Sequence, residues 1–269
     1  MERGVSLERA LEIASQFPMH RDSETVPLDQ ASGRILLDDL ISLVDDPRFD
    51  NSAMDGWAVR EADCEEPGAV LRIVGTSQAG SADVPTVAGG EACSIMTGAP
   101  IPEGADSIVM VEDSSTNEGT VKIIGPARPG FIRRRGENLT KGDQPLKSGD
   151  ILTPSAISLA ATMGHDRVSV VRQPSIAVIG VGDELTPPGE PLPENSIYES
   201  NTFGISSLVK KTGGEPRRFE LIRDSIDNLR EALDQAAESC DAIITSGGVS
   251  MGKCDIVRQI MEEEGDVKF

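Results

Sequence analysis

Hydrophobic residues recur at helical spacing in two short parts of the chain. Behind Ser6, whose hydroxyl can cap a helix, they return every three or four positions as far as Phe17, and Pro18 ends the pattern. A second apolar face with the same spacing lies within residues 154–164. The pattern therefore predicts an amphipathic helix over residues 6–17 and another helix over residues 154–164.

Between these helices the apolar residues come in short runs that glycine and proline interrupt. Four runs, AVLRIVG, EACSIMTG, SIVMVED and TVKIIG, predict strands of a small, mainly β module. The stretch FDNSAMDGWAVR, residues 49–60, is too polar in our interpretation for a core strand and too specific for a linker. Three methionines in or beside these motifs, Met54, Met96 and Met110, are predicted to fill the core.

From residue 174 onwards strands and helices alternate along the chain. The strand-like runs are SIAVIGV, RRFELI and DAIITS, and the helical patterns are NTFGISSLVKKTG, SIDNLREALDQAAES and KCDIVRQIMEEEG. This alternation predicts a three-layer α/β domain whose parallel strands are joined by right-handed crossovers. Ligands of such sheets bind outside the carboxyl ends of the strands.

The pattern divides the chain into three predicted parts. A mainly β module over residues 45–135 is inserted into a mixed linking domain, which residues 1–44 and 136–173 form together. The α/β domain occupies residues 174–269. The predicted fold class is therefore α/β and β with several domains, and 269 residues are long enough for more than one core.

Composition and charge exclude several classes of protein. No apolar run reaches the roughly 18 residues of a membrane span and no secretory pattern opens the chain, so we expect a soluble cytoplasmic protein. Four cysteines without CxxC spacing and two histidines argue against a disulfide framework or a structural zinc site. The net charge of −20 argues against nucleic-acid binding, and the short cluster Arg133 to Arg135 favours a solvated turn. An anionic substrate would therefore need backbone amides, a cation or a few placed basic groups.

The segment TSGGVSMGKCD is a candidate anion-binding loop. Gly247 and Gly248 let the chain turn tightly at a strand end, backbone N–H groups lead into the next helix, and Ser250 adds a hydroxyl donor. The pattern matches neither the Walker motif nor the dinucleotide fingerprint. A strand-to-helix turn that needs small residues only for packing explains the same glycines equally well.

Acidic residues follow the predicted strands at the same edge of the sheet. Glu184, Asp224 and Asp255 would bring carboxylates beside the glycine loop, an arrangement that suits a phosphate held with Mg²⁺. The competing interpretation is that each is an ordinary solvated loop acid.

These loops, together with FDNSAMDGWAVR and IMTGAPIPEGADSIVMVED, resemble the molybdopterin molybdenumtransferase family, which includes MoeA and the E domain of gephyrin. RRRGENLTKGD, IGVGDEL and ITSGGVSMGKCD extend the resemblance in the same order over essentially the whole chain. The resemblance implies an elongated homodimer that accepts adenylylated molybdopterin, inserts molybdate and releases AMP with the help of Mg²⁺. The family's cleft lies between the α/β domain of one subunit and the β module of the other.

The resemblance also implies roles for individual residues. The implied catalytic residues are Asp55, Thr97, Glu184 and Asp255. The implied substrate-binding residues are Asn51, Ser52, Asp224, Gly247, Gly248 and Ser250. Asp55, Glu184 and Asp255 are the implied Mg²⁺ ligands.

Each motif of the β module keeps a plainer interpretation. Asp55 and Gly56 could form only a turn, and Asn51 with Ser52 only a loop cap. Trp57 is predicted to be a packing anchor rather than a stacking ring for substrate. Thr97 could be a strand-end hydroxyl that satisfies the backbone.

Two features depart from the family pattern. Asn138 stands where the family usually has aspartate, and an amide cannot hold a cation as a carboxylate does. The chain ends at Phe269, about where the family continues into a lysine-containing KPGKP-type loop, implicated in molybdate binding, and a C-terminal β-barrel domain.

Two other functions are therefore considered. The first is a non-catalytic homologue that binds the pterin nucleotide as a carrier, regulator or scaffold. The second is the nucleotide-binding domain of an unrelated phosphohydrolase, which the acidic loops permit and the motifs of the β module do not. Either molybdate or tungstate suits the predicted reaction, and the adenylylation step could come from a partner protein.

Overall fold

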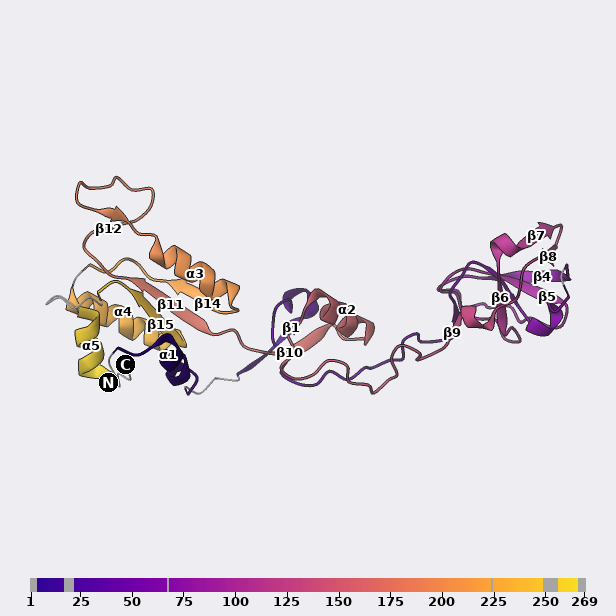
Figure 1. Ribbon diagram of the computed structural model, residues 1–269, viewed down its shortest axis with the longest axis horizontal. Coiled ribbons are helices and arrows are strands. Elements are labelled where there is room, and N and C mark those ends of the chain that lie inside the picture. Colours follow the sequence, from indigo (N-terminus) through magenta and orange to yellow (C-terminus); the bar gives the residue numbers. More distant parts are fainter. Residues whose placement is uncertain (1–3, 17–21, 67, 224, 249–255, 266–269) are drawn as a thin grey trace. The chain divides into compact units, whose positions relative to one another are not determined.

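The computed structural model describes residues 4–16, 22–66, 68–223, 225–248 and 256–265 (Figure 1). The chain forms two compact units, here called the α/β unit and the β unit. The α/β unit comprises Met1–Val26, Gly33–Leu37 and Ser169–Phe269. The β unit comprises Pro27–Ser32 and Asp38–Val168. The three-part division predicted from the sequence is finer than these two units and stays a prediction.

A six-stranded sheet in the order β6-β3-β5-β4-β8-β7 forms the body of the β unit. Its strands are β3 (Gly56–Val59), β4 (Val70–Ser77), β5 (Glu91–Ile95), β6 (Ser107–Met110), β7 (Ser114–Asn117) and β8 (Thr120–Ile123). The β4–β5 pair is parallel and the other pairs are antiparallel. Trp57 and Val59 belong to one buried cluster and Ala58 to another, so β3 is covered on both faces.

The interpretation of FDNSAMDGWAVR as too polar for a core strand is wrong for its second half. Gly56–Val59 is a fully buried strand between β5 and β6. A Cβ at Gly56 would lie only 2.0 Å from the carbonyl oxygen of Val109. Trp57 is a packing anchor as predicted, because it is 7% exposed and its Nε1 donates to Ser114 Oγ at 2.9 Å.

The prediction that the methionines fill the core is wrong for two of them. Met54 is 37% exposed and Met96 is 47% exposed, whereas Met110 is half-buried. The predicted strand SIVMVED also ends early, because Val111–Asp113 forms a 3-10 helix. β7 follows it and was not predicted, since its sequence SSTN carries no apolar alternation.

β2 (Asn51–Ser52) and β9 (Ile132–Arg133) form a short antiparallel pair. Asp50 accepts from the N–H of Arg135 at 2.8 Å and from Nη1 of Arg134 at 2.7 Å. These hydrogen bonds lower the pKa of Asp50. The predicted solvated cluster is therefore exposed but partly ion-paired, with Arg134 and Arg135 held against the connecting segments.

The remaining elements of the β unit are short. They are α2 (Pro154–Thr162), whose first turn Thr153 caps, and the 3-10 helices η1 (Leu28–Gln30), η2 (Glu61–Asp63), η3 (Val111–Asp113) and η4 (Pro129–Phe131). The predicted helix over residues 154–164 is thus confirmed. None of the helices among the described residues combines the length and apolarity that crossing a bilayer requires.

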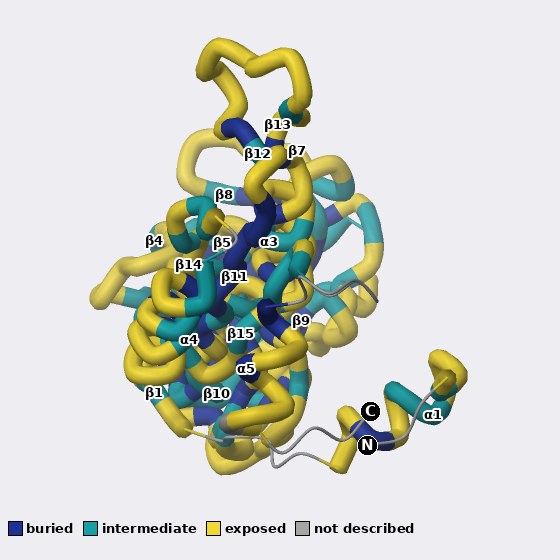
Figure 2. Tube along the Cα trace, turned by 90° about the vertical axis from the view of Figure 1, so that its left-hand side faces the viewer, coloured by how far each residue is buried: buried dark blue, intermediate teal, exposed yellow. Residues whose placement is uncertain are grey.

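The α/β unit contains a parallel sheet in the order β14-β11-β15. Its strands are β11 (Ser175–Gly180), β14 (Glu215–Arg218) and β15 (Ala242–Ser246), and its helices are α3 (Asn201–Lys211), α4 (Ile226–Ser239) and α5 (Ile256–Glu264). The central strand β11 is buried along almost its whole length (Figure 2). A small parallel pair, β12 (Leu185–Thr186) with β13 (Ile197–Tyr198), follows the first sheet strand.

Different helices cover the two faces of this sheet (Figure 1). Ala177, Ile179 and Val181 pack in one buried cluster with residues of α4 and α5. A Cβ at Gly180 would lie 3.2 Å from the side chain of Thr202, so the opposite face meets α3. The alternation of side chains along β11 therefore separates the two helical layers.

One predicted strand of this unit is displaced, and one predicted helix is described only in part. The strand expected over residues 217–222 begins at Glu215 and ends at Arg218, although a single bridge joins Ile222 to Val181. The helix expected over residues 253–265 is described from Ile256, and its first three residues lie outside the described residues.

The N-terminal segment is tied to the α/β sheet by hydrogen bonds and ion pairs. It forms α1 (Leu7–Ala14), capped by Ser6 as predicted, and β1 (Ser23–Pro27), which pairs with β10 (Arg167–Val171). Just after β10, Arg172 donates to both carboxylate oxygens of Asp241 at 2.7 and 2.8 Å and to Asp22 at 3.3 Å. These bonds raise the pKa of Arg172.

The contact between Gly56 and Val109 predicts a specific loss of stability. Gly56→Ala forces β3 away from β6, and we expect the free energy of unfolding of the β unit to fall by about 2 kcal/mol or more. Fluorescence of Trp57, the only tryptophan, measures this during denaturation. Gly130→Ala is the matched control, because no atom lies within 4 Å of its Cβ position. Equal unfolding midpoints for the two variants would contradict the prediction.

The hydrogen bonds of Asp50 predict how stability depends on pH. Because the pKa of Asp50 is lower in the folded chain, its contribution is present above about pH 4 and is lost as the pH falls through the lowered pKa. Asp50→Asn should therefore lower stability at pH 7 and weaken the pH dependence below pH ~4. Acid titration of Trp57 fluorescence tests this against Asp83→Asn, an exposed acid of the same unit. The same acid profile in the wild type and Asp50→Asn would count against it.

Candidate functional site

The β unit brings Asp55 and Thr97 together although 42 residues separate them in sequence. The N–H of Thr97 donates to Asp55 Oδ1 at 2.6 Å. This bond, with a further one from the Thr97 side chain, lowers the pKa of Asp55. Asp55 is therefore an anion at neutral pH with a fixed orientation.

The register of the sheet produces this contact. Gly56 pairs with Ile95 in the antiparallel β3–β5 ladder, so the chain before Gly56 runs beside the chain after Ile95. Asp55 and Thr97 lie just outside the last pair of the ladder. The loops NSAMDG and MTGAP are thus positioned by strands rather than by their own turn preferences.

Asn51 and Ser52 are buried and hold these loops by hydrogen bonds. Ser52 is fully buried, and its hydroxyl donates to the carbonyl of Met54 at 2.6 Å. The N–H of Gly98 donates to the carbonyl of Ser52 at 2.8 Å, which joins the two loops directly. Asn51 is 7% exposed and donates to the carbonyl of Phe49. Both side chains hold the loop, and direct contact with a substrate stays a prediction.

In the α/β unit, three strand ends meet at Val181. Its N–H donates to the carbonyl of Ser246 at 2.9 Å, and the N–H of Gly182 donates to the carbonyl of Ile222 at 3.0 Å. A Cβ at Gly247 would lie 2.0 Å from the carbonyl oxygen of Val181. The predicted meeting of the segments after β11, β14 and β15 is therefore confirmed where the structure describes them.

Both glycines of the candidate anion loop need their small size and their backbone geometry. Gly247 has a φ of 95° and Gly248 a φ of 65°, which other residues rarely adopt. A Cβ at Gly248 would also lie 2.8 Å from the side chain of Val257 in α5. The structure thus agrees with the interpretation that these glycines are needed for packing. Their role in anion binding stays a prediction. Ser250 lies outside the described residues.

The structure describes only one of the three acidic residues predicted at this edge of the sheet. Glu184 is exposed, and a Cβ at Gly182 would lie 2.6 Å from Glu184 Oε2, so the carboxylate lies over this glycine. Asp224 and Asp255 lie outside the described residues. Within the described part of the chain, no group of three or more His, Cys, Asp or Glu side chains could hold a metal ion. The predicted Mg²⁺ ligand set is therefore untested.

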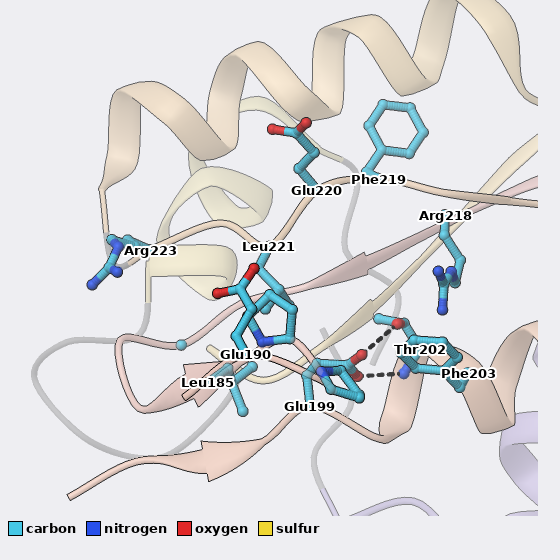
Figure 3. A pocket seen from close by; sticks show the side chains of 13 residues that line it. Leu185, Glu190, Glu199, Thr202, Phe203, Arg218, Phe219, Glu220, Leu221 and Arg223 are labelled. Carbon is cyan, nitrogen blue, oxygen red and sulfur yellow. Dashed lines mark hydrogen bonds between the residues drawn. The ribbon is translucent and has the colours of Figure 1, made fainter. Parts of the chain in front are cut away.

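A cavity of about 690 Å³ lies beside these strand ends (Figure 3). It is lined by Gly182, Leu185, Pro187, Pro188, Glu190, Glu199, Thr202, Phe203, Arg218, Phe219, Glu220, Leu221 and Arg223. Ligands of parallel sheets are expected outside the carboxyl ends of the strands, and the α/β unit has a cavity of suitable size there.

Sequence reasoning missed Glu199, a buried carboxylate at this cavity. Its two oxygens accept from the N–H and the hydroxyl of Thr202 at 2.6 and 2.7 Å, and the residue is 4% exposed. Asn201 Nδ2 donates to Ser246 Oγ at 2.9 Å and links the start of α3 to the end of β15. The available signal was the run YESNT, an acid just before a helix start.

Phe203 and Arg218 were also missed. The Arg218 guanidinium carbon lies 3.7 Å from the centroid of the Phe203 ring. Phe203 comes from the first turn of α3 and Arg218 from the end of β14, so the pair forms only when the helix packs on the sheet. No short motif could have indicated it.

Asn138, the departure from the family pattern, has a defined partner. Its Nδ2 donates to Asp46 Oδ2 at 3.1 Å. A carboxylate at position 138 would face Asp46 with like charge, whereas the amide makes a favourable contact. The substitution therefore suits its local surroundings.

Comparisons with known proteins show which family the chain resembles. The chain matches the model of the MoeA N-terminal region (domain I and II) over residues 5–164 and that of a probable molybdopterin binding domain over residues 177–269. A molybdopterin molybdenumtransferase from Haemophilus influenzae is 38% identical over 94% of this chain and 63% of its own length. Molybdopterin molybdenumtransferase 2 from Mycobacterium tuberculosis is 39% identical over 87% of this chain and 59% of its own length.

The solved structures that resemble this chain include MoeA proteins. A molybdopterin biosynthesis MoeA protein from Pyrococcus horikosii has a TM-score of 0.80 at 33% identity and covers 98% of this chain and 68% of its own. The chain spans about three fifths of the length of the curated relatives named above. Since the first family model covers residues 5–164 and the second covers most of the rest, the chain belongs to the MoeA family.

Proposed function

We propose that the chain acts in molybdenum cofactor biosynthesis as a molybdopterin molybdenumtransferase. In this reaction molybdate or tungstate enters adenylylated molybdopterin and AMP is released. The observation that carries the proposal is the hydrogen bond between Thr97 N–H and Asp55, because it fixes an ionised carboxylate in a loop pair that resembles the family's site. The names of the relatives support the same reaction.

The two units would contribute different chemistry. The β unit offers an oriented anion, Asp55, that can hold a cation or a polar group of the substrate. The α/β unit offers the glycine turn at Gly247 and Gly248 and, lined by other residues, a cavity of about 690 Å³. Backbone N–H groups at such a turn can bind a phosphate even on a chain with a net charge of −20.

We propose Mg²⁺ as the cofactor, with Asp55, Glu184 and Asp255 as its ligand residues. When bound, the ion would neutralise charge on the phosphate oxygens. We further propose a cytoplasmic homodimer that receives its substrate from an adenylylating protein. These points rest on the family resemblance.

One observation favours the second candidate, a non-catalytic module that binds the pterin nucleotide. Asn138 donates to Asp46 at 3.1 Å at a position where the resemblance implies an aspartate. Such a module would keep the cavity of the α/β unit and its ligand while lacking turnover.

The experiment that tests the proposal is an AMP-release assay. Purified chain is incubated with adenylylated molybdopterin, molybdate and Mg²⁺, and we expect AMP to form. Asp55→Asn should reduce the rate at least about 100-fold, because an amide cannot supply the charge that the carboxylate provides. Circular dichroism verifies that the variant is folded.

Glu118→Gln is the matched control, since Glu118 is an exposed acid of the same unit at the turn between β7 and β8. It should leave the rate unchanged. If the substrate binds but no AMP appears with the wild-type chain, the binding-module candidate is favoured. If Asp55→Asn releases AMP at the wild-type rate, Asp55 has no catalytic role.

A further inference from the structure

We infer that Phe203 and Arg218 form a stacking platform for a flat heteroaromatic ring that carries a phosphate. The inference rests on the proposed function, because such a ring occurs at both ends of adenylylated molybdopterin. It adds two residues that neither the motifs nor the resemblance indicated.

The platform is a cation–π pair that remains open to ligand. The guanidinium of Arg218 lies 3.7 Å from the ring centroid of Phe203, and both residues line the cavity (Figure 3). Phe203 is 45% exposed, so part of its ring is free to meet a ligand. A planar ligand can extend this stack, as bases do on aromatic side chains and guanidinium planes.

The two residues before Phe203 hold it in place. Its neighbour Thr202 is bound by both oxygens of the buried Glu199. Asn201 is hydrogen-bonded to Ser246 at the end of β15. The backbone that carries the ring is therefore fixed to the sheet before any ligand arrives, and little ordering is needed on binding.

The charges around the cavity do not by themselves attract a phosphate, so a ligand needs a ring as well. Figure 3 shows Arg218 and Arg223 at opposite ends of the cavity. Glu190, Glu199 and Glu220 also line it, so its acids outnumber its two arginines. A small free anion gains little there, and the affinity must come from the stacked ring, with Arg223 near the phosphate. The volume of about 690 Å³ lies within the usual range for small-molecule sites.

Isothermal titration calorimetry on the 269-residue chain tests the platform without turnover. The probes are AMP, neopterin phosphate and ribose 5-phosphate. Phe203→Leu should weaken binding of a ring-bearing probe about tenfold, whereas ribose 5-phosphate, which lacks the ring, should bind weakly and to the same extent in the wild type and the variant. Phe203→Trp should keep or strengthen the ring-bearing probe, because tryptophan restores the stacking surface.

Leu208→Ala is the matched control, since Leu208 is a 62% exposed apolar residue of the same helix outside the cavity lining. It should bind every probe as the wild type does. A loss confined to AMP assigns the platform to the adenine end of the substrate, and a loss confined to neopterin phosphate assigns it to the pterin end.

Three results would overturn the platform: no binding of either ring-bearing probe to the wild type, equal binding to Phe203→Leu, or equal weakening of all three probes. The outcome is separate from that of the AMP-release assay. A chain without turnover could still lose ring binding in Phe203→Leu, and an active chain could bind its substrate without this residue.

Discussion

The main-chain carbonyl of Val181 is the point around which the site of the α/β unit is built. Val181 follows the central strand β11, with Ser246 hydrogen-bonded on one side and Ile222 bridged on the other. A side chain at Gly247 would collide with this carbonyl, so the chain that leaves β15 can turn here only as glycine. The loops that follow β11 and β14 line the cavity, and they take their positions from the sheet.

The β unit positions its loops by an equivalent constraint. Gly56 packs against the carbonyl of Val109 in β6 and pairs with Ile95 in β5. A shift by one residue would turn every side chain of β3 to the opposite face and separate Asp55 from Thr97. The polar loop and the buried strand thus depend on each other. Gly56 sets the register of β3, and Asp55 beside it accepts the hydrogen bond from Thr97.

How much of this structure can be predicted from the sequence depends on how close the interacting residues are along the chain. The caps at Ser6 and Thr153 involve only neighbours in sequence, and those helices were predicted correctly. The exposure of Met96 depends on what packs over it from elsewhere, so a thioether alone could not reveal it. Glu199 is buried because a helix start covers it, against the usual preference of glutamate for solvent. The family resemblance indicated Asp55 and Thr97 as site residues but not their hydrogen bond, and side chains that meet only across packed layers had no motif.

Arg172 joins parts of the chain that are made at very different times. Asp22 precedes it by 150 residues, and Asp241 follows it by 69. During synthesis from the N-terminus, the whole β unit is made after Asp22 and before Arg172. The β unit can therefore fold as a finished insert while the N-terminal segment waits for its partner strand β10. A nascent chain halted before residue 241 would thus carry a folded β unit, whereas Arg172 would lack Asp241 and the α/β sheet would lack β15.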